Sequence, residues 1–281
     1  MFAVEEVEEG VRRFVMSRRM LGKDLYRCAC YLVGDLLVDT GIFHRRKDFA
    51  ASLADFRVAA VVNTHAHEDH MGANGLLQER RRIPVYAHEQ ALPVLADPGK
   101  LALLPYQRFF FGEPTPSQGE AIGESIRAGR HAFRVLHTPG HSPDHIALFE
   151  KERGWIFSGD AYIGGQDRVF RERYDILGIL ESLRRLAALD AEVMFTGMGS
   201  VIRNPARKIR RKIEYYERIS ERVGALHRQG IEASEIARRL FPRDFAVRLA
   251  TSGDFSTAHL IRSMTELDAI PNRPRTSDPR R

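Results

Sequence analysis

A cluster of histidine and carboxylate side chains at positions 64–70 constrains this chain more than any other feature of its sequence. The run Thr-His-Ala-His-Glu-Asp-His places three histidines and two carboxylates within six residues, directly after the apolar run at 58–62. That apolar run is typical of a buried strand, and Gly72 and Asn74 indicate a turn into a helix. A loop at the end of a strand can aim several side chains at one point, and neutral imidazole is the commonest protein ligand of metal ions. The sequence therefore predicts a metal site in this loop.

Length and composition describe an ordinary globular protein. The chain has 281 residues, of which 43% are hydrophobic and 28% charged, so it can bury a substantial core. No apolar run reaches the length that spans a bilayer, and residues 1–10 are acidic and lack the order of a secretion signal. The two cysteines, Cys28 and Cys30, fit unpaired strand thiols in a reducing compartment. We therefore expect a cytoplasmic protein without a membrane span.

The charge balance permits an anionic partner without establishing one. The net charge is +6, which is compatible with binding to RNA or to a phosphorylated substrate. Much of the basic excess lies in residues 203–222 and in the last ten residues. A run of charge is equally compatible with the solvated face of a helix.

Short apolar runs and polar loops alternate along the first 200 residues. Gly34 and Asp35 separate two apolar runs and predict a hairpin turn. Further strands are expected at 57–64, 132–137, 146–150, 155–158 and 193–196, with a helix that Asp175 caps. Because polar loops follow several of these strands, ligands far apart in the sequence can converge at one rim of a two-sheet core.

The pattern changes after Ser200. Asn204 and Pro205 are predicted to be the N-cap and the first residue of a long helix, and shorter helices are expected at 233–240 and 257–267. We therefore divide the chain into a catalytic domain (1–203), a helical, winged-helix-like appendage (204–269) and a tail (270–281). The tail is rich in proline and arginine and is expected to be disordered.

The order of several separated motifs resembles that of the metallo-β-lactamase-fold hydrolases. The motifs are Asp39-Thr40-Gly41, then His65-x-His67-x-Asp69-His70, then Thr-Pro-Gly-His ending at His141, and Ser-Gly-Asp ending at Asp160. The resemblance covers about residues 25–205 and implies an α/β fold, a four-layer αβ/βα sandwich. The helical end resembles the appendage of the subgroup that contains the β-lactamase-like endoribonucleases.

The resemblance also implies a metal centre with two positions. Its ligands would be His65, His67 and His141 in the first position and Asp69 and His70 in the second, with Asp160 bridging both. One or two divalent ions are expected, with zinc as the first choice and manganese or iron as alternatives. A metal-held hydroxide is a nucleophile at neutral pH, and Asp69 is the candidate catalytic residue that orients it or passes a proton to the leaving group.

One position departs from the family pattern. The family usually has a histidine between two glycines after the last core strand, where this chain has Met198. A thioether is a soft, weak ligand that suits copper(I) better than zinc, manganese or iron(II), so we do not count Met198 as a ligand. The second metal position is therefore expected to be weak or empty.

Four further polar residues are candidates for supporting roles. Asp39 is expected to accept a hydrogen bond from a ligand, and His145 is either a support of the ligands, a substrate contact or a structural residue. Tyr162 and Tyr174 follow Asp160 closely enough to contact substrate, although packing in the core explains them equally well. Glu68, which alternates with the ligands, is expected to point away from them.

The leading functional hypothesis is a metal-dependent hydrolase of a small-molecule ester, thioester or lactone. A second hypothesis is an endoribonuclease or phosphodiesterase that binds single-stranded nucleic acid through the basic helix after Pro205. A third is a mononuclear iron persulfide dioxygenase, and a fourth is a scaffold without activity. The sequence leaves the oligomeric state open, with a homodimer as one alternative.

Overall fold

The alternation of side chains along the central strands explains why the chain builds two sheets with helices outside them. The computed structural model describes residues 1–20, 22–242 and 244–268. In β3 (Lys23–Val33), Cys30 and Leu32 point into one core, whereas Tyr31 and Val33 point into another. Successive residues of a strand face opposite sides, so a sheet that is apolar on both faces needs a layer on each side.

The first sheet has seven strands in sequential order. The first four are antiparallel to their neighbours, and the last four, β4 to β7, run parallel. The predicted hairpin is confirmed, because β3 and β4 pair across the turn at Gly34 and Asp35. The other strands of this sheet are β1 (Phe2–Glu8), β2 (Val11–Met20), β4 (Leu36–Val38), β5 (Ala60–Val62), β6 (Val85–Ala87) and β7 (Gly119–Ala121).

The second sheet has six strands in the order β14-β13-β11-β10-β9-β8, with one parallel pair, β11 and β13. Its strands are β8 (Ser125–Ala128), β9 (His131–His137), β10 (Ile146–Glu150), β11 (Trp155–Gly159), β13 (Val193–Thr196) and β14 (Val201–Arg203). Aromatic side chains fill the space between the sheets, for example Tyr31 against Phe157 and Phe195, with ring centroids 5.5 Å apart in both pairs.

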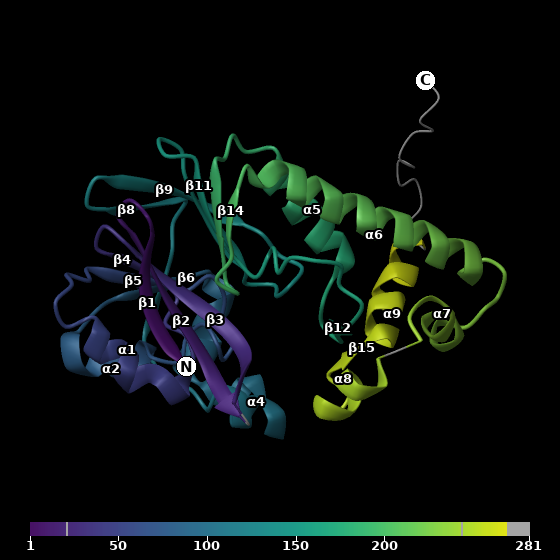
Figure 1. Cartoon of the computed structure of the whole chain (residues 1–281), viewed down its shortest axis with the longest axis horizontal. Helices are drawn as coiled ribbons and strands as arrows, with labels where there is room; N and C mark the ends of the chain where they lie inside the picture. Colours follow the sequence, from purple (N-terminus) through teal and green to yellow (C-terminus); the bar gives the residue numbers. More distant parts are fainter. Residues whose placement is uncertain (21, 243, 269–281) are drawn as a thin grey trace.

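Helices cover the outer face of each sheet, which makes four layers (Figure 1). The first sheet packs on α1 (Arg46–Ser52), α2 (Asn74–Arg81), α3 (Leu92–Ala96) and α4 (Pro105–Phe110). The second sheet packs on α5 (Ile176–Ala187), and Asp175 caps this helix as predicted by accepting hydrogen bonds from the amides of Leu177 and Gly178. The predicted α/β fold, an αβ/βα sandwich with helices after it, is confirmed.

The C-terminal helices share one core with the second sheet. Those in this core are α6 (Pro205–His227), α7 (Ala233–Leu240) and α9 (Thr257–Asp268), whereas α8 (Phe245–Ala250) buries none of its residues. The two-residue strand β15 (Phe255–Ser256) pairs with β12 (Phe170–Arg171), which ties the appendage to the loop after β11. The proposed boundary at 203/204 therefore separates segments that pack together, and the division into domains stays a prediction. The expected tail at 270–281 lies outside the described residues.

The start of α6 and the state of the two cysteines largely match the expectations. Asn204 and Pro205 are the N-cap and the first residue of α6, as predicted. The backbone of Asn204 is left-handed (φ 49°), however, and its side chain makes no cap hydrogen bond. Both cysteines are buried and free, as expected. Within the described ranges, no helix combines the length and apolarity that a membrane crossing requires.

The loops that carry the candidate ligands leave the two sheets at the same rim. Asp39 follows β4, the histidine cluster follows β5, the loop with His141 follows β9, Asp160 follows β11 and Met198 follows β13. The strands β4 and β5 are parallel, and so are β11 and β13. Strand β10 is antiparallel to both β9 and β11, so β9 and β11 run in the same direction. Carboxyl ends of strands that run in one direction meet at one edge of a sheet.

Candidate metal centre and cavity

Three histidine ring nitrogens converge at this rim. Nδ1 of His67 lies 3.0 Å from Nε2 of His65 and 3.0 Å from Nε2 of His141. Two nitrogens bound to one ion at about 2.0–2.1 Å lie roughly 3 Å apart, so these three atoms fit a single divalent ion. The donor set of three imidazoles is one that zinc and other borderline metals accept.

Burial prepares these histidines for coordination. Burial, reinforced by the neighbouring histidines, lowers the pKa of His65 and of His141 well below the usual histidine value. Burial and the nearby charge of Arg171 do the same to the pKa of His67. Only a neutral imidazole has a free lone pair for a metal, so the rings are in the ligating form at neutral pH.

A second group of ligand atoms lies beside the first. His65, His70 and Asp160 each offer one atom within 4.8 Å of the others. The two oxygens of Asp160 face different histidines: Oδ2 lies 3.7 Å from Nε2 of His141, and Oδ1 lies 3.6 Å from Nε2 of His70. His70 Nε2 and Asp160 Oδ1 are buried without a hydrogen-bond partner in the described part of the chain. Two facing polar atoms without partners fit a cation between them.

Asp69 lies at the edge of this second group and also lines the cavity described below. Its Oδ2 lies 3.8 Å from Nε2 of His70, but Asp69 belongs to neither compact set of ligand atoms. Burial raises the pKa of Asp69 to about 7, which outweighs the attraction to protonated His70. A carboxyl with a pKa near neutrality can both accept and donate a proton.

Asp39 holds His70 from the side opposite the ligand atoms. Its Oδ2 lies 2.8 Å from Nδ1 of His70, and the same carboxylate accepts hydrogen bonds from the amide and hydroxyl of Thr64 at 2.7 and 2.8 Å. Burial disfavours a charged His70, but the carboxylates of Asp39, Asp69 and Asp160 outweigh burial and raise its pKa well above the usual value. The same attraction acts on Asp160: the positive charge of His70 outweighs burial and lowers the pKa of Asp160. Asp39 thus lies where it can orient His70, and its supporting role stays a prediction.

His145 supports Asp160 through the backbone. Its Nε2 accepts a hydrogen bond from the amide of Asp160 at 3.0 Å, and its Nδ1 lies 2.8 Å from the hydroxyl of Thr138. Burial lowers the pKa of His145 to about 3, so the ring is a neutral structural residue. His145 is not among the residues that line the cavity, so support of Asp160 or a purely structural role stays the prediction.

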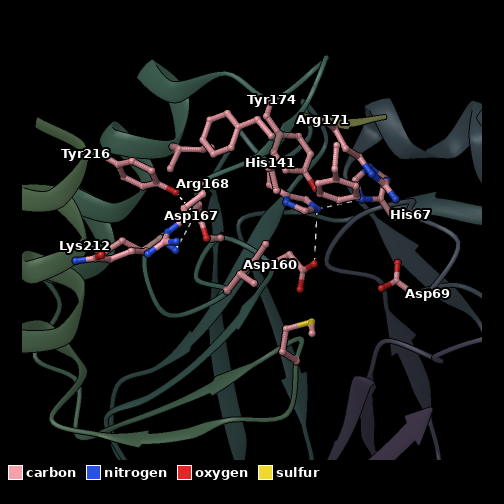
Figure 2. Close-up of a pocket in the computed structure, with 18 of the residues that line it drawn as sticks. His67, Asp69, His141, Asp160, Asp167, Arg168, Arg171, Tyr174, Lys212 and Tyr216 are labelled. Atoms are coloured by element: carbon pink, nitrogen blue, oxygen red, sulfur yellow. Dashed lines mark hydrogen bonds and ion pairs between the residues drawn. The ribbon is translucent and has the colours of Figure 1, made fainter. Parts of the chain in front are cut away.

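A cavity of about 340 Å³ opens directly beside the candidate ligands (Figure 2). His67, Asp69, His141, Asp160 and Met198 contribute to its wall. Aromatic and aliphatic side chains form much of the rest, namely Tyr26, Ile163, Val169, Phe170, Tyr174, Ile179, Tyr216 and Phe255. A volume above about 300 Å³ with an apolar lining and a few polar groups is typical of a small-molecule site.

The two tyrosines suggested by the sequence lie in different places. Tyr174 lines the cavity, and its ring centroid is 4.6 Å from that of His141, so it can contact a substrate. Tyr162 is buried outside the cavity wall, with the ammonium of Lys212 5.3 Å from the centroid of its ring. Only Tyr174 is placed as a substrate contact.

Sequence reasoning missed a charged network behind the metal motif. Glu68 is completely buried, and its Oε1 accepts hydrogen bonds from Gln107 at 2.7 Å and from Arg171 at 3.2 Å. Arg171 lines the cavity and also pairs with Asp254 of the appendage at 3.2 Å. Glu68 does point away from the ligands, but into an ion pair and not into solvent. No local pattern marks Arg171, because its two carboxylate partners come from distant parts of the chain.

The pH dependence of metal binding should differ between the two positions. The lowered pKa values of His65, His67 and His141 mean that protons compete with the first metal only well below pH 6.5. His70 has a raised pKa, so a metal at the second position must displace a proton, and its affinity should fall as the pH falls. Zinc stoichiometry after equilibrium dialysis between about pH 8 and pH 6.5 should therefore show a constant first equivalent and a declining second one. Parallel loss of both equivalents would contradict this assignment.

Comparison with known proteins supports the same grouping. Residues 24–198 match the sequence model of the Metallo-beta-lactamase superfamily, which is more than half of the chain. The chain belongs to the metallo-beta-lactamase superfamily. The family segment contains every candidate ligand, from the cluster after β5 to Asp160.

Three curated relatives illustrate the similarity. The chain is 30% identical to an atrochrysone carboxyl ACP thioesterase of Aspergillus fumigatus over 67% of this chain and 54% of that protein. It is 37% identical to a hydroxyacylglutathione hydrolase of Halorhodospira halophila over 48% of this chain and 45% of that protein. It is 26% identical to the beta-lactamase-like protein 2 homolog of Caenorhabditis elegans over 78% of this chain and 73% of that protein. The chain thus spans about half the length of the first two relatives.

Solved metallo-beta-lactamase structures extend the likeness to the appendage. A family protein from Thermus thermophilus is 24% identical, with a TM-score of 0.68 over 93% of this chain and 95% of that one. A beta-lactamase domain protein from Burkholderia ambifaria is 22% identical, with a TM-score of 0.70 over 95% of this chain and 89% of that one. At these identities the likeness concerns the fold alone, and the endoribonuclease-type subgroup stays a prediction.

Proposed function

We propose that this protein is a metal-dependent thioesterase, which splits an acyl thioester into a carboxylic acid and a thiol. The observation that carries the proposal is a cavity with a largely apolar lining whose wall includes candidate metal ligands. Two relatives are named for reactions on thioesters, a carrier-protein thioesterase and a hydroxyacylglutathione hydrolase, which favours this class over esters and lactones.

The metal would be held by the residues that the sequence singles out. His65, His67 and His141 form the first position, His70 and Asp69 the second, and Asp160 faces both. We propose zinc in the first position, because it accepts three histidines with one open site for water or substrate. A divalent ion bound there lowers the pKa of a coordinated water and polarises a carbonyl oxygen.

The chain's own residues supply the remaining requirements of the reaction. The raised pKa of Asp69, about 7, suits a group that takes a proton from the attacking water and returns it to the departing thiolate. Arg171 lies on the cavity wall, where its ion pairs with Glu68 and Asp254 hold the guanidinium in place and offset its charge. Tyr174 and the aliphatic side chains of the wall exclude water from the acyl group.

A substrate panel tests the proposal directly. Metal-replete enzyme is offered an acyl thioester, a lactone, a phosphodiester and a single-stranded RNA, while elemental analysis records the bound metals. We expect release of free thiol from the thioester, loss of that activity with a chelator and recovery on adding zinc. Faster turnover of the phosphodiester or the RNA than of the thioester would reject the thioesterase assignment.

Two alternatives from the sequence remain predictions with their own tests. Nucleic-acid binding through α6 should weaken steeply with salt, because each neutralised phosphate releases counterions. Absence of binding at low salt removes that alternative. A persulfide dioxygenase should contain iron and consume oxygen, which elemental analysis and an oxygen electrode measure. Homodimer formation and cytoplasmic location also stay predictions.

Replacing Met198 by histidine should strengthen the second metal position. Met198 lines the cavity close to the ligands, and Gly197 beside it approaches Asp160 and His70 so closely that a Cβ there would lie 2.2 Å from Oδ1 of Asp160. An imidazole in place of the thioether offers the ligand that the family usually has. We expect Met198→His to raise zinc stoichiometry toward two per chain, measured by elemental analysis, with Met198→Leu as the control. Equal stoichiometry in both variants would count against a weakened second position.

A further inference from the structure

One wall of the cavity is a loop that the metal centre does not use. The loop at 163–169 connects the segment after Asp160 to β12, and five of its residues line the cavity. They are Ile163, Gln166, Asp167, Arg168 and Val169. Three of these five carry polar or charged side chains, in contrast to the mainly apolar lining elsewhere.

Helix α6 of the appendage fixes this loop in place. The ammonium of Lys212 lies 2.9 Å from Oδ2 of Asp167 and donates a hydrogen bond to the carbonyl of Gly164 at 3.0 Å. The hydroxyls of Tyr215 and Tyr216 donate to the backbone carbonyl and the carboxylate of Asp167. The Lys212 side chain is only 3% exposed although it lines the cavity, so this end of the cavity is a built and rigid structure.

The charges at this end leave one positive charge without a partner. Lys212 and Asp167 neutralise each other as a close pair. Arg168 is exposed at the cavity wall, and no carboxylate of the described chain pairs with its guanidinium. An unpaired guanidinium presents several N–H donors in a planar fork, which suits carboxylate and phosphate groups.

The position of these residues relates them to the reaction site. In Figure 2, Lys212, Asp167 and Arg168 lie together on the side opposite Asp69, with His141 and Asp160 between the two groups. A substrate whose carbonyl group lies at the metal ligands therefore extends toward Arg168 on one side. The cavity lining also includes the apolar side chains of Val169 and Ile179, which suit an uncharged connecting chain.

We infer that Arg168, next to the neutral pair of Lys212 and Asp167 (Figure 2), forms a subsite for the anionic group on the thiol half of the substrate. This inference rests on the proposed thioesterase function. The thiols that carry acyl groups in cells end in carboxylates, as in glutathione, or in phosphates, as in coenzyme A and phosphopantetheine. Both groups are oxyanions that Arg168 can bind through the same N–H donors.

The test compares thioesters that share one acyl group but differ in the thiol. Coenzyme A carries phosphates, glutathione carries carboxylates, and N-acetylcysteamine is uncharged. We expect Arg168→Ala to lower kcat/KM for at least one charged thioester, relative to the uncharged one, by about tenfold, which is typical of a lost charge-assisted hydrogen bond. The charged thioester with the larger loss identifies phosphate or carboxylate as the bound group. The matched control is Arg173→Ala, since Arg173 is exposed on the next segment and does not line the cavity.

The outcomes separate this inference from the proposed function. An unchanged ratio for both charged thioesters in Arg168→Ala, or an equal change in Arg173→Ala, would overturn the subsite. If no thioester is hydrolysed, including the uncharged one, the thioesterase proposal fails, and the subsite is then tested by binding alone. Calorimetric binding of desulfo-coenzyme A and S-methylglutathione then decides about the subsite. Binding that weakens about tenfold in Arg168→Ala supports it, whereas unchanged or absent binding of both probes overturns it.

Discussion

Replacement of Asp160 by alanine is expected to abolish thioester hydrolysis and to lower the metal content of the protein. Asp160 is the residue whose two oxygens face both sets of ligands, 3.7 Å from His141 and 3.6 Å from His70. Its loss removes the carboxylate that faces both positions and leaves Nε2 of His70 without the Asp160 oxygen that lies 3.6 Å from it. We expect kcat/KM to fall by about 10³-fold or more, equivalent to about 4 kcal/mol of transition-state stabilisation.

Two measurements decide this prediction. Elemental analysis should give less than one metal per chain for Asp160→Ala, and thiol release should stay near background even with added zinc. Asp190→Ala is the matched control, because Asp190 is an exposed carboxylate after α5, away from the cavity. An Asp160→Ala protein with full metal content and full activity would refute the bridging role.

Replacement of Asp39 should reduce both stability and metal affinity. Asp39 is 2% exposed, and its carboxylate satisfies His70 Nδ1 and two donors of Thr64. Alanine leaves these buried groups unpaired, which costs about 3–5 kcal/mol of unfolding free energy. The backbone of Asp39 is left-handed (φ 62°), a conformation that alanine also tolerates poorly.

The asparagine variant separates the two effects. An asparagine side chain keeps the shape of the aspartate and its tolerance for a left-handed backbone but lacks the charge that orients His70. We expect Asp39→Asn to lower the affinity of the second metal about 10- to 100-fold with a smaller loss of stability. Asp48→Ala, which removes an exposed carboxylate paired with Arg45, should leave the unfolding free energy within about 0.5 kcal/mol. Metal affinity equal to wild type in Asp39→Asn would show that Asp39 only stabilises the fold.

Most regular elements of the family segment follow from local patterns. The strand at 193–196 and the helix at 233–240 have the predicted bounds, and the hairpin at Gly34 and the helix capped by Asp175 lie where expected. These segments combine strong apolar periodicity with turn or cap residues. The long strands β1 and β2 were not predicted, because arginine and glutamate interrupt their apolar pattern.

The residues that complete the cavity were harder to find from sequence. Lys212 lies on the apolar stripe of α6, between Ile209 and Tyr216, and a lysine in that position was the one available signal. Arg171 has no such signal, since Glu68 and Asp254 reach it from distant positions on either side of it in the sequence. Ion pairs between distant residues depend on how layers pack, which local periodicity does not record.

The sequence by itself determined the fold and indicated a divalent-metal site made of histidine and aspartate side chains. Ligating side chains are confined to short motifs that directly follow buried strands, and both the donor types and the strand periodicity are local properties. Only the tertiary structure decided how the site is completed, because the cavity forms where the loop at 163–169 meets α6, and Asp254 of the appendage meets Arg171. Those contacts join segments far apart in the chain. Their positions depend on the packing of the C-terminal helices against the second sheet.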